Sequence, residues 1–311
     1  MISDKHNPPG LVRLLQIDLK KYWSVYLMVL PLLGYYIIFR YVPMYGTIIA
    51  FLEYKPLRGI GGSAWVGLKH FSTFFSGFYF ARTLTNTLII SFETLLFGFP
   101  APILLALLFN ELNLKLFKKT AQTISYLPHF ISTIVLCGII RKFTASDGVI
   151  SDILMAFGKP RETLLLNPHL FRTIYVISDI WQTVGWGSII YLSALSAVDP
   201  QLYEAARIDG AGRTKQVVHI TLPGIAPTII IMLILRVGRI MDVGYEKIML
   251  LYNEVTYETA DVISTYVYRK GILNGEYDYS AAVGLFNSVI NFMLIIGANA
   301  FSRRVNETSL W

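Results

Sequence analysis

Six stretches of mostly apolar residues recur along the chain, and they constrain its fold more than any other feature. A helix needs about 20 such residues to cross about 30 Å of hydrocarbon. The stretches cover 22–39, 88–109, 120–140, 170–195, 228–250 and 281–301. Charged residues make up only 15% of the 311 residues, too few to cover a soluble core of this size. We therefore predict an all-α polytopic membrane protein with six transmembrane helices.

An even number of spans places both ends of the chain on one side of the membrane. We expect an N-terminal tail (1–21), a first span with a long outer loop (22–86), a core (87–301) and a C-terminal tail (302–311). Lys and Arg are more frequent per residue in one group of segments, the two tails and the loops 110–119 and 196–226 taken together, than in the outer loops 40–86, 141–169 and 249–280 taken together. This bias favours cytoplasmic termini, although Arg141/Lys142 and Arg269/Lys270 run against it.

The formal net charge of +7 raises the question of nucleic acid. The basic residues, however, form short clusters beside apolar runs, as at Lys20/Lys21, Lys118/Lys119 and Arg303/Arg304. Anionic lipid headgroups account for such clusters. The sequence therefore predicts contact with membrane lipid and no nucleic-acid partner.

Charges interrupt the fifth stretch. Arg236, Arg239 and Asp242 cost about +3 kcal/mol each at a bilayer centre, whereas each Ile, Leu or Val contributes only about −0.5. With Glu246 they are spaced 3, 3 and 4, which predicts one helical face turned toward protein or water. The expected counter-charges are Glu93 and Asp179.

Two interpretations of this stripe stay open: polar contacts that fix helix packing, or a hydrated route for a polar solute. Asn287 and Asn291, four apart on the sixth span, fit either. Trp181, Gln182 and Trp186 are candidate sugar contacts, although aromatic belts explain most membrane tryptophans. The candidate pathway residues are Glu93, Asp179, Trp181, Gln182, Trp186, Arg236, Arg239, Asp242, Asn287 and Asn291.

The loop between the fourth and fifth spans has strong helix signals. Asp199 is a suitable N-cap followed by Pro200, and Gly210 supplies a left-handed stop. A second short helix is expected over 213–220, ending before Leu222-Pro223. The loop is thus predicted to be a compact helix-turn-helix on the inner membrane surface, where its short residues allow another surface to approach closely.

This loop resembles the EAA signature of permease subunits in binding-protein-dependent ABC importers. The resemblance lies in Glu204-Ala205-Ala206, Asp209-Gly210-Ala211, Ile220, Leu222-Pro223 and Pro227, and its place between spans four and five is similar to the maltose-type sugar permeases. Other segments are similar to the LplB-type branch, implicated in oligo- and polysaccharide uptake. They include 65–71, 243–247, 251–253, 257–262, 265–269 and Leu310-Trp311.

The resemblance implies a type I ABC importer transmembrane domain in a bacterial cytoplasmic membrane. It implies a coupling helix seated in a cytoplasmic ATPase, with coupling residues Tyr203, Glu204, Ala205, Ala206, Asp209, Gly210, Leu222 and Pro223. It also implies two ATPase subunits, a second homologous permease subunit, an extracytoplasmic solute-binding protein and an oligo- or polysaccharide substrate. ATP and Mg would be bound by the ATPase, and this chain would bind no cofactor.

The sequence itself contains no catalytic motif. A G-x-x-x-x-G-K-[ST] phosphate loop is absent, as are H-E-x-x-H, G-x-S-x-G and paired Cys/His metal ligands. We therefore expect a permease rather than an enzyme. The alternatives are an ABC permease for another polar solute and an ion-coupled secondary transporter using Arg239 and Asp242.

Overall fold

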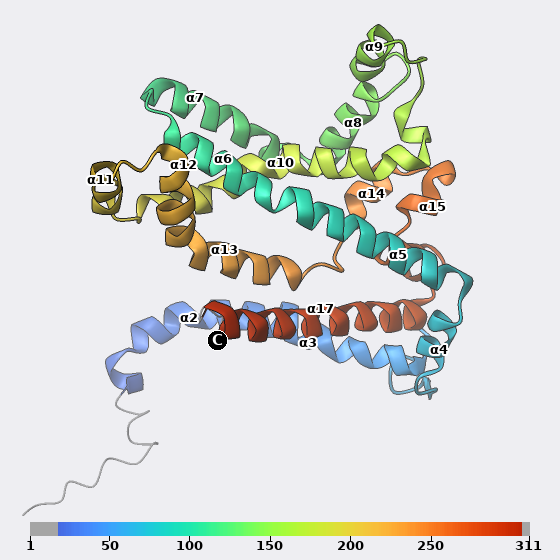
Figure 1. Ribbon diagram of the computed structural model, residues 1–311. Helices are drawn as coiled ribbons and strands as arrows, with labels where there is room; N and C mark the ends of the chain where they lie inside the picture. Colours follow the sequence, from blue (N-terminus) through green and yellow to red (C-terminus); the bar gives the residue numbers. More distant parts are fainter. Residues whose placement is uncertain (1–17, 307–311) are drawn as a thin grey trace, which may run out of the picture.

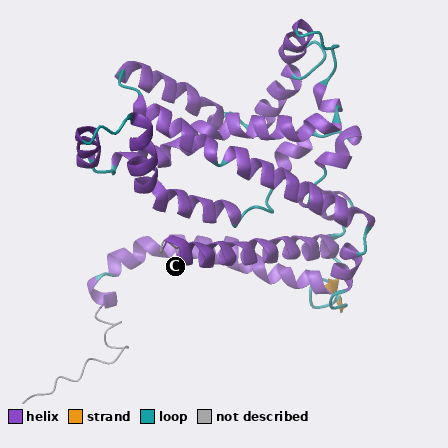
Figure 2. Cartoon of the chain, in the orientation of Figure 1, coloured by secondary structure: helices purple, strands orange, loops and turns teal. Residues whose placement is uncertain are grey.

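The chain folds into an elongated bundle of helices that lie roughly side by side (Figures 1 and 2). The computed structural model describes residues 18–306, so most of both predicted tails and the Leu310-Trp311 ending lie outside the described residues. Within 18–306 the only strands are β1 (Leu52–Glu53) and β2 (Ala64–Trp65), which pair antiparallel with Leu52 opposite Trp65. The all-α prediction is confirmed.

The helices are interrupted by short π- or 3-10-helical turns, which carry η labels. The first half contains α2 (Trp23–Tyr36), η1 (Ile37–Tyr41), α3 (Val42–Met44), η2 (Tyr45–Phe51), α4 (Lys69–Phe75), α5 (Phe78–Glu93), η3 (Thr94–Gly98), α6 (Pro100–Glu111), α7 (Lys115–Tyr126), η4 (Leu127–Phe130), α8 (Thr133–Phe143), α9 (Val149–Ala156) and η5 (Leu164–Leu166). The second half contains α10 (Pro168–Ser196), α11 (Pro200–Ile208), α12 (Arg213–Gln216), η6 (Val217–Thr221), α13 (Leu222–Val237), α14 (Tyr245–Leu251), η7 (Glu254–Thr256), α15 (Tyr257–Ala260), α16 (Ile263–Tyr268), η8 (Arg269–Leu273) and α17 (Tyr277–Asn306).

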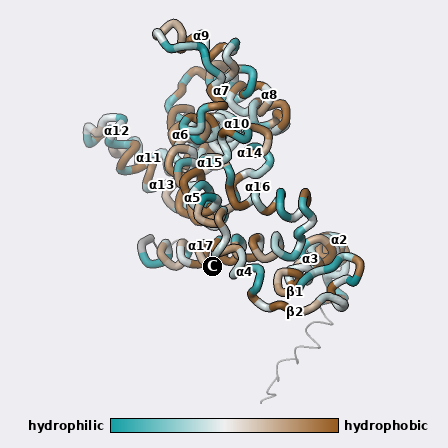
Figure 3. The backbone as a smooth tube through the Cα atoms, turned by 90° about the vertical axis from the view of Figure 1, so that its right-hand side faces the viewer, coloured by the Kyte–Doolittle hydropathy of each residue, from teal (hydrophilic) through white to brown (hydrophobic). Residues whose placement is uncertain are grey.

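Four helices in the described part of the chain are long and apolar enough to cross a membrane. They run over Trp23–Phe51, Phe78–Glu111, Arg213–Val237 and Tyr277–Arg304. The first two are longer than predicted, and the second continues through the π turn η3 into α6, where Pro100 occupies the tolerant first position. Hydrophobic residues recur along these helices (Figure 3).

Helix α10 provides the predicted fourth span and lies at the centre of the bundle. It has 29 residues, about 43 Å at 1.5 Å per residue, and contacts α5, α6, α7, α13 and α15. A helix surrounded by protein needs less apolar surface than one facing lipid, so α10 can carry Asp179 and Gln182. Its buried Phe171, Tyr175 and Val176 belong to the largest core cluster.

The predicted third span, 120–140, is not one straight helix. Lys115–Phe130 and Thr133–Phe143 meet at 102°, with the break at Ile131 and Ser132. Pro128 lies in the 3-10 turn η4 just before the break, and the Ser132 side chain accepts a hydrogen bond from the Val135 N–H to start α8. The hydrophobic pattern predicted this segment but did not predict the bend.

The predicted fifth span, 228–250, is wrong in its bounds. Its helix begins at Arg213 and ends at Val237, and a non-helical segment leads to α14. Asn291 Oδ1 accepts a hydrogen bond of 3.0 Å from the Met241 N–H in that segment. Because the helix ends at Val237, Arg239 and Asp242 do not lie on a lipid-facing helix. The segment that carries them packs against the protein.

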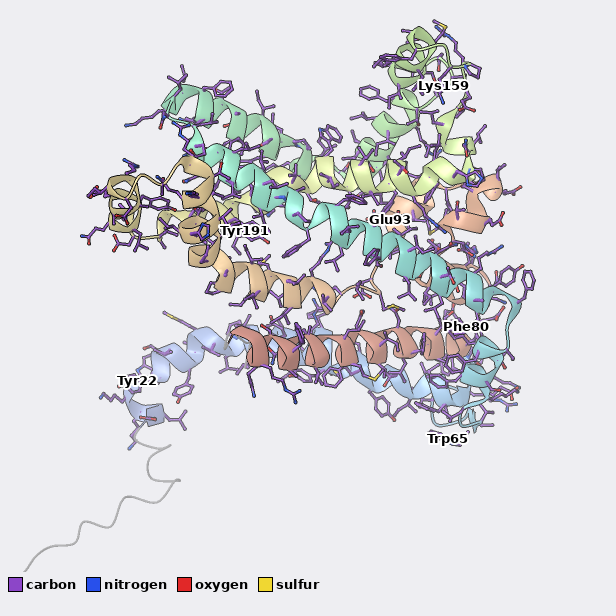
Figure 4. All side chains as sticks on the ribbon, viewed as in Figure 1. Tyr22, Trp65, Phe80, Glu93, Lys159 and Tyr191 are labelled. Atoms are coloured by element: carbon purple, nitrogen blue, oxygen red, sulfur yellow. The ribbon has the colours of Figure 1, made fainter. Side chains whose placement is uncertain are left out.

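The two ends of the bundle differ in what they carry (Figure 1). The start of α2, the end of α17, α11 and the turn between α6 and α7 gather at one end. The opposite end carries α4, α9, α15 and the small sheet, and Figure 4 shows Trp65 and Lys159 there and Tyr22 at the other end. The elements predicted to be cytoplasmic therefore share one end.

Candidate functional site

A polar cavity of about 730 Å³ opens between α5, α10, α13 and the segment that follows α13. This volume is within the roughly 300–1,000 Å³ typical of small-molecule sites. Its walls combine hydroxyl, amide and charged groups with a few apolar side chains. They come from Ser91, Thr94, Leu95, Thr133, Tyr175, Asp179, Gln182, Met232, Leu235, Arg236, Arg239, Ile240, Asp242, Val243, Gly244, Glu246 and Lys247.

The predicted charge stripe does line this cavity, although it is not a helical face. Only Arg236 is in α13, whereas Arg239 and Asp242 are in the non-helical segment and Glu246 is in α14. The broken backbone, rather than a 3.6-residue period, brings the four together. The stripe prediction was therefore right about the residues and wrong about the geometry.

Asp179 is the central acid of the cavity. Its Oδ2 lies 3.9 Å from Arg236 Nη2 and its Oδ1 lies 3.6 Å from Lys247 Nζ. Asp179 thus provides the counter-charge expected for Arg236, and it does so for two cations at once. Both separations exceed ordinary charge-assisted hydrogen bonds of about 2.7–2.9 Å.

Lys247 was not among the predicted pathway residues. It is in α14, its side chain is only 6% exposed, and its ammonium lies 5.2 Å from the Tyr175 ring centroid. The sequence carried a signal for it, since a charged residue follows Val243-Gly244-Tyr245-Glu246 in an otherwise apolar stretch. A single helix over 228–250 would place Lys247 near its end, so that prediction does not include Lys247 in the pathway.

Five of the predicted pathway residues lie outside the cavity lining: Glu93, Trp181, Trp186, Asn287 and Asn291. Glu93 is partly buried near the end of α5 (Figure 4), and no ion pair links it to the cavity cations in the described structure. Trp186 stacks on His129 with ring centroids 4.7 Å apart, and Trp181 is 43% exposed. Gln182 does line the cavity. Of the two expected counter-charges, Asp179 lines the cavity and Glu93 does not.

Asn287 and Asn291, on α17, hold the non-helical segment in place. Asn287 Nδ2 donates to Asp242 Oδ1 at 3.0 Å, and Asn291 accepts from the backbone of residue 241. Neither lines the cavity. Both contacts fix packing, and the Asn287 bond also orients one acid of the cavity.

The predicted coupling segment is a short exposed helix at the opposite end of α13. Helix α11 starts at the Asp199 cap, whose side chain accepts from the Gln201 N–H at 2.9 Å, and Gly210 has φ +74°. Glu204 and Ala205 are exposed, while Ala206 is partly buried. Beside them lies a second cavity of about 630 Å³, lined by Tyr203, Glu204 and Arg207 and by the turn after α6.

The second helix of this loop does not end before Leu222-Pro223 as predicted. It continues from Arg213 through Pro223 to Val237. The π turn η6 precedes Pro223, which lies within the first two positions of α13, where a missing N–H and a fixed φ are tolerated. The second part of the coupling loop, from Arg213, and the cavity residue Arg236 are consequently on one continuous helix.

An unpredicted ionic cluster closes the other end of the bundle. Asp261 is fully buried and accepts two hydrogen bonds from Arg269, at 2.8 and 2.6 Å, and Arg82 lies 3.6 Å away. Nearby, a hydrogen bond from Lys270 to Glu276 raises the pKa of Lys270. These pairs tie α5 to α16 and η8 on the side opposite the coupling segment.

A helical membrane bundle with an internal polar cavity and an exposed helix at one end is typical of a transport permease. The chain belongs to the family of binding-protein-dependent transport system inner membrane components, whose model matches residues 98–307. The matched region begins in η3 and includes the coupling loop and the cavity segment.

Similar proteins indicate the branch of the family to which the chain belongs. The chain is 44% identical to the polygalacturonan/rhamnogalacturonan transport system permease protein YteP of Bacillus subtilis (strain 168), over 97% of this chain and 92% of YteP. It is also 44% identical to the protein LplB of that organism, over 94% and 92%. A crystal structure of a bacterial ABC transporter involved in import of the acidic polysaccharide alginate contains a chain that is 45% identical, with a TM-score of 0.87 and coverage of 94% and 99%. The predicted LplB-type membership and importer fold are confirmed.

Proposed function

We propose that this chain forms half of the membrane pathway of an ATP-driven importer for oligosaccharides or polysaccharide fragments. The observation that carries the proposal is the polar cavity between α5, α10 and α13. A sugar presents many hydroxyl groups, and Ser91, Thr94, Thr133 and Gln182 offer partners for them inside a membrane bundle. The saccharides in the name of YteP and in the description of the alginate transporter support the same class of solute.

Helix α11 would be the seat for the ATPase. It is exposed, it ends in a left-handed glycine, and it contains no buried residue, so a partner surface can surround it. Reversing a two-state equilibrium from 1:99 to 99:1 takes about 5.5 kcal/mol of differential binding. A charged hydrogen bond at Glu204 supplies only about 1.5–3 kcal/mol, so apolar seating and a second coupling helix must contribute. ATP and Mg would be held by the ATPase and not by this chain.

The remaining partners follow from the two ends of the bundle. We place the termini and α11 in the cytoplasm, so the outer segments 52–77 and 249–276, which lie within the predicted loops 40–86 and 249–280, would dock the solute-binding protein that the family description names. Six membrane segments form half a pathway, which requires a second permease subunit, more fittingly a related chain than a copy. If α11 lay on the outer side of the membrane, this orientation would be reversed.

Copurification and vesicle uptake test the proposal together. The assembly would be purified through this chain, and the ATPase should be retained by wild type and lost on Glu204→Arg. Reconstituted vesicles should take up a saccharide only with ATP and the binding protein. Uptake without ATP would favour an ion-coupled transporter, and uptake of peptides or amino acids but no saccharide would assign another polar solute. Labelling of residue 204 from outside intact cells would overturn the orientation.

A further inference from the structure

Lys247 is a buried cation whose donors are unused. Its residue is 5% exposed, it lines the larger cavity, and its Nζ has no hydrogen-bond partner among residues 18–306. An ammonium group has three N–H donors and no acceptor. Burying such a group without hydrogen bonds is unfavourable, so its retention at a cavity wall points to a ligand that completes it.

The backbone of Lys247 is fixed by the core. Ile248 and Leu251, from the same helix α14, are fully buried in the main hydrophobic cluster with Leu136 and Val176. The Lys247 carbonyl accepts a contact of 3.9 Å from the Cys137 thiol. The ammonium is further confined by the Tyr175 ring, so the group is held in place before any ligand arrives.

The unfilled donors of Lys247 favour an anion. Asp242 and Glu246 are exposed, as are Arg236 and Arg239, so Lys247 and Asp179 are the charged residues of the cavity lining that are not exposed. Asp179 is shared with Arg236 at 3.9 Å and leaves the Lys247 N–H donors without a hydrogen bond. A carboxylate forms stronger hydrogen bonds with an ammonium than a neutral hydroxyl does.

We infer that Lys247 is a specificity-determining residue that binds the carboxylate of a uronic-acid unit in the cavity, with Arg236 as its second cation. The inference rests on the proposed saccharide transport and goes beyond it, because it assigns the recognition of charge to one residue. In this arrangement Asp179 lies between the two cations, and the carboxylate of the sugar accepts the hydrogen bonds of the Lys247 ammonium that Asp179 leaves unfilled.

The test uses the complete transporter in vesicles with its binding protein. Uptake kinetics would be measured for oligogalacturonate, alginate oligomers, their carboxyl-reduced forms, and neutral arabino- and malto-oligosaccharides. Each would be run with wild type, Lys247→Met and Lys247→Arg. Lys159→Met provides a matched control, because Lys159 is exposed at the outer tip of the bundle (Figure 4). Thermal melting of every purified variant would separate folding from recognition.

To remove discrimination by the binding protein, direct binding of the same oligomers to the detergent-purified complex without that protein would also be measured. We expect Lys247→Met to weaken binding of a charged oligomer, and to raise its KM, by about tenfold or more. Binding and KM of the carboxyl-reduced oligomer should change by less than about twofold. Lys247→Arg should restore most of the affinity, and Lys159→Met should behave as wild type.

The outcomes separate this inference from the proposed function. Equal loss for charged and reduced oligomers, an unchanged affinity in Lys247→Met, or transport confined to neutral saccharides would overturn the role of Lys247 and leave saccharide import intact. Failure of every saccharide in a complex that hydrolyses ATP would overturn the proposed function itself. A Lys247→Met variant that does not fold, beside a Lys247→Arg variant that folds and has lost charged-oligomer binding, would also count against the inference.

Discussion

The Tyr203 hydroxyl lies 3.0 Å from the Thr221 hydroxyl, within hydrogen-bonding distance. Tyr203 belongs to the exposed coupling helix, whereas Thr221 is 2% exposed on the helix that runs to Val237. The 15 residues from Thr221 to Arg236 span about 22 Å. One hydrogen bond thus joins the coupling segment to the helix that carries a cavity arginine.

We predict that Tyr203→Phe partly uncouples transport from ATP hydrolysis. The bond contributes about 0.5–1.5 kcal/mol, so folding and ATPase association should survive while less motion of α11 reaches α13. Uptake per ATP hydrolysed, measured in vesicles, should fall several-fold. Thr221→Val should have the same effect, and the double variant should be no worse than either. Additive losses would show that the two hydroxyls do not act together.

Arg236→Ala should lower transport more than it lowers the yield of folded protein. The Arg236 side chain is half exposed and its pair with Asp179 is long, so its contribution to stability is about 0–1 kcal/mol. Its loss removes a cation from the cavity wall. Uptake and the monodisperse yield in detergent would be compared with those of Arg161→Ala, an exposed arginine away from the cavity. A parallel fall in uptake and yield would leave only a packing role.

In contrast to Arg236→Ala, Asp261→Ala should mainly lower the stability of the folded protein. The carboxylate is fully buried and its removal leaves Arg269 without its two hydrogen bonds, which typically costs about 3–5 kcal/mol. We expect a large drop in melting temperature or no folded protein. Asp147→Ala, which removes an exposed pair with Lys142, should melt like wild type. Unchanged melting in the Asp261 variant would mean that the cluster does not stabilise this end.

Gly185→Ala should prevent α10 from packing against α7. A Cβ at Gly185 would lie 1.9 Å from the Ser125 carbonyl oxygen, so one backbone must move. At Gly138, in α8, a Cβ would meet nothing within 4 Å. We expect aggregation or a lowered melting temperature for Gly185→Ala and near-normal behaviour for Gly138→Ala, measured by size-exclusion chromatography and thermal melting. Normal packing in both would show that the two helices can separate at little cost.

Much of the site could be predicted because charged residues inside apolar stretches are few and conspicuous. Arg236, Arg239, Asp242 and Asp179 all line the cavity, as the cost of exposing them to lipid required. Glu93, Trp181 and Trp186 do not line this cavity, because the direction of their side chains depends on neighbours far away in the chain. Lys247 was missed for the same reason, since nothing local shows that the helix ends at Val237.

The sequence alone determined that this protein is a helical membrane bundle of the importer family, with a capped short helix between its fourth and fifth segments. Those features depend on local physics: the length of apolar runs, and the caps and turns that Asp199, Pro200 and Gly210 favour. Only the tertiary structure decided that 213–237 is one helix, that the following backbone breaks, and that Lys247 turns inward. These outcomes depend on contacts between residues distant in the chain, such as Asn291 with the backbone of residue 241, whose energies a local pattern does not contain.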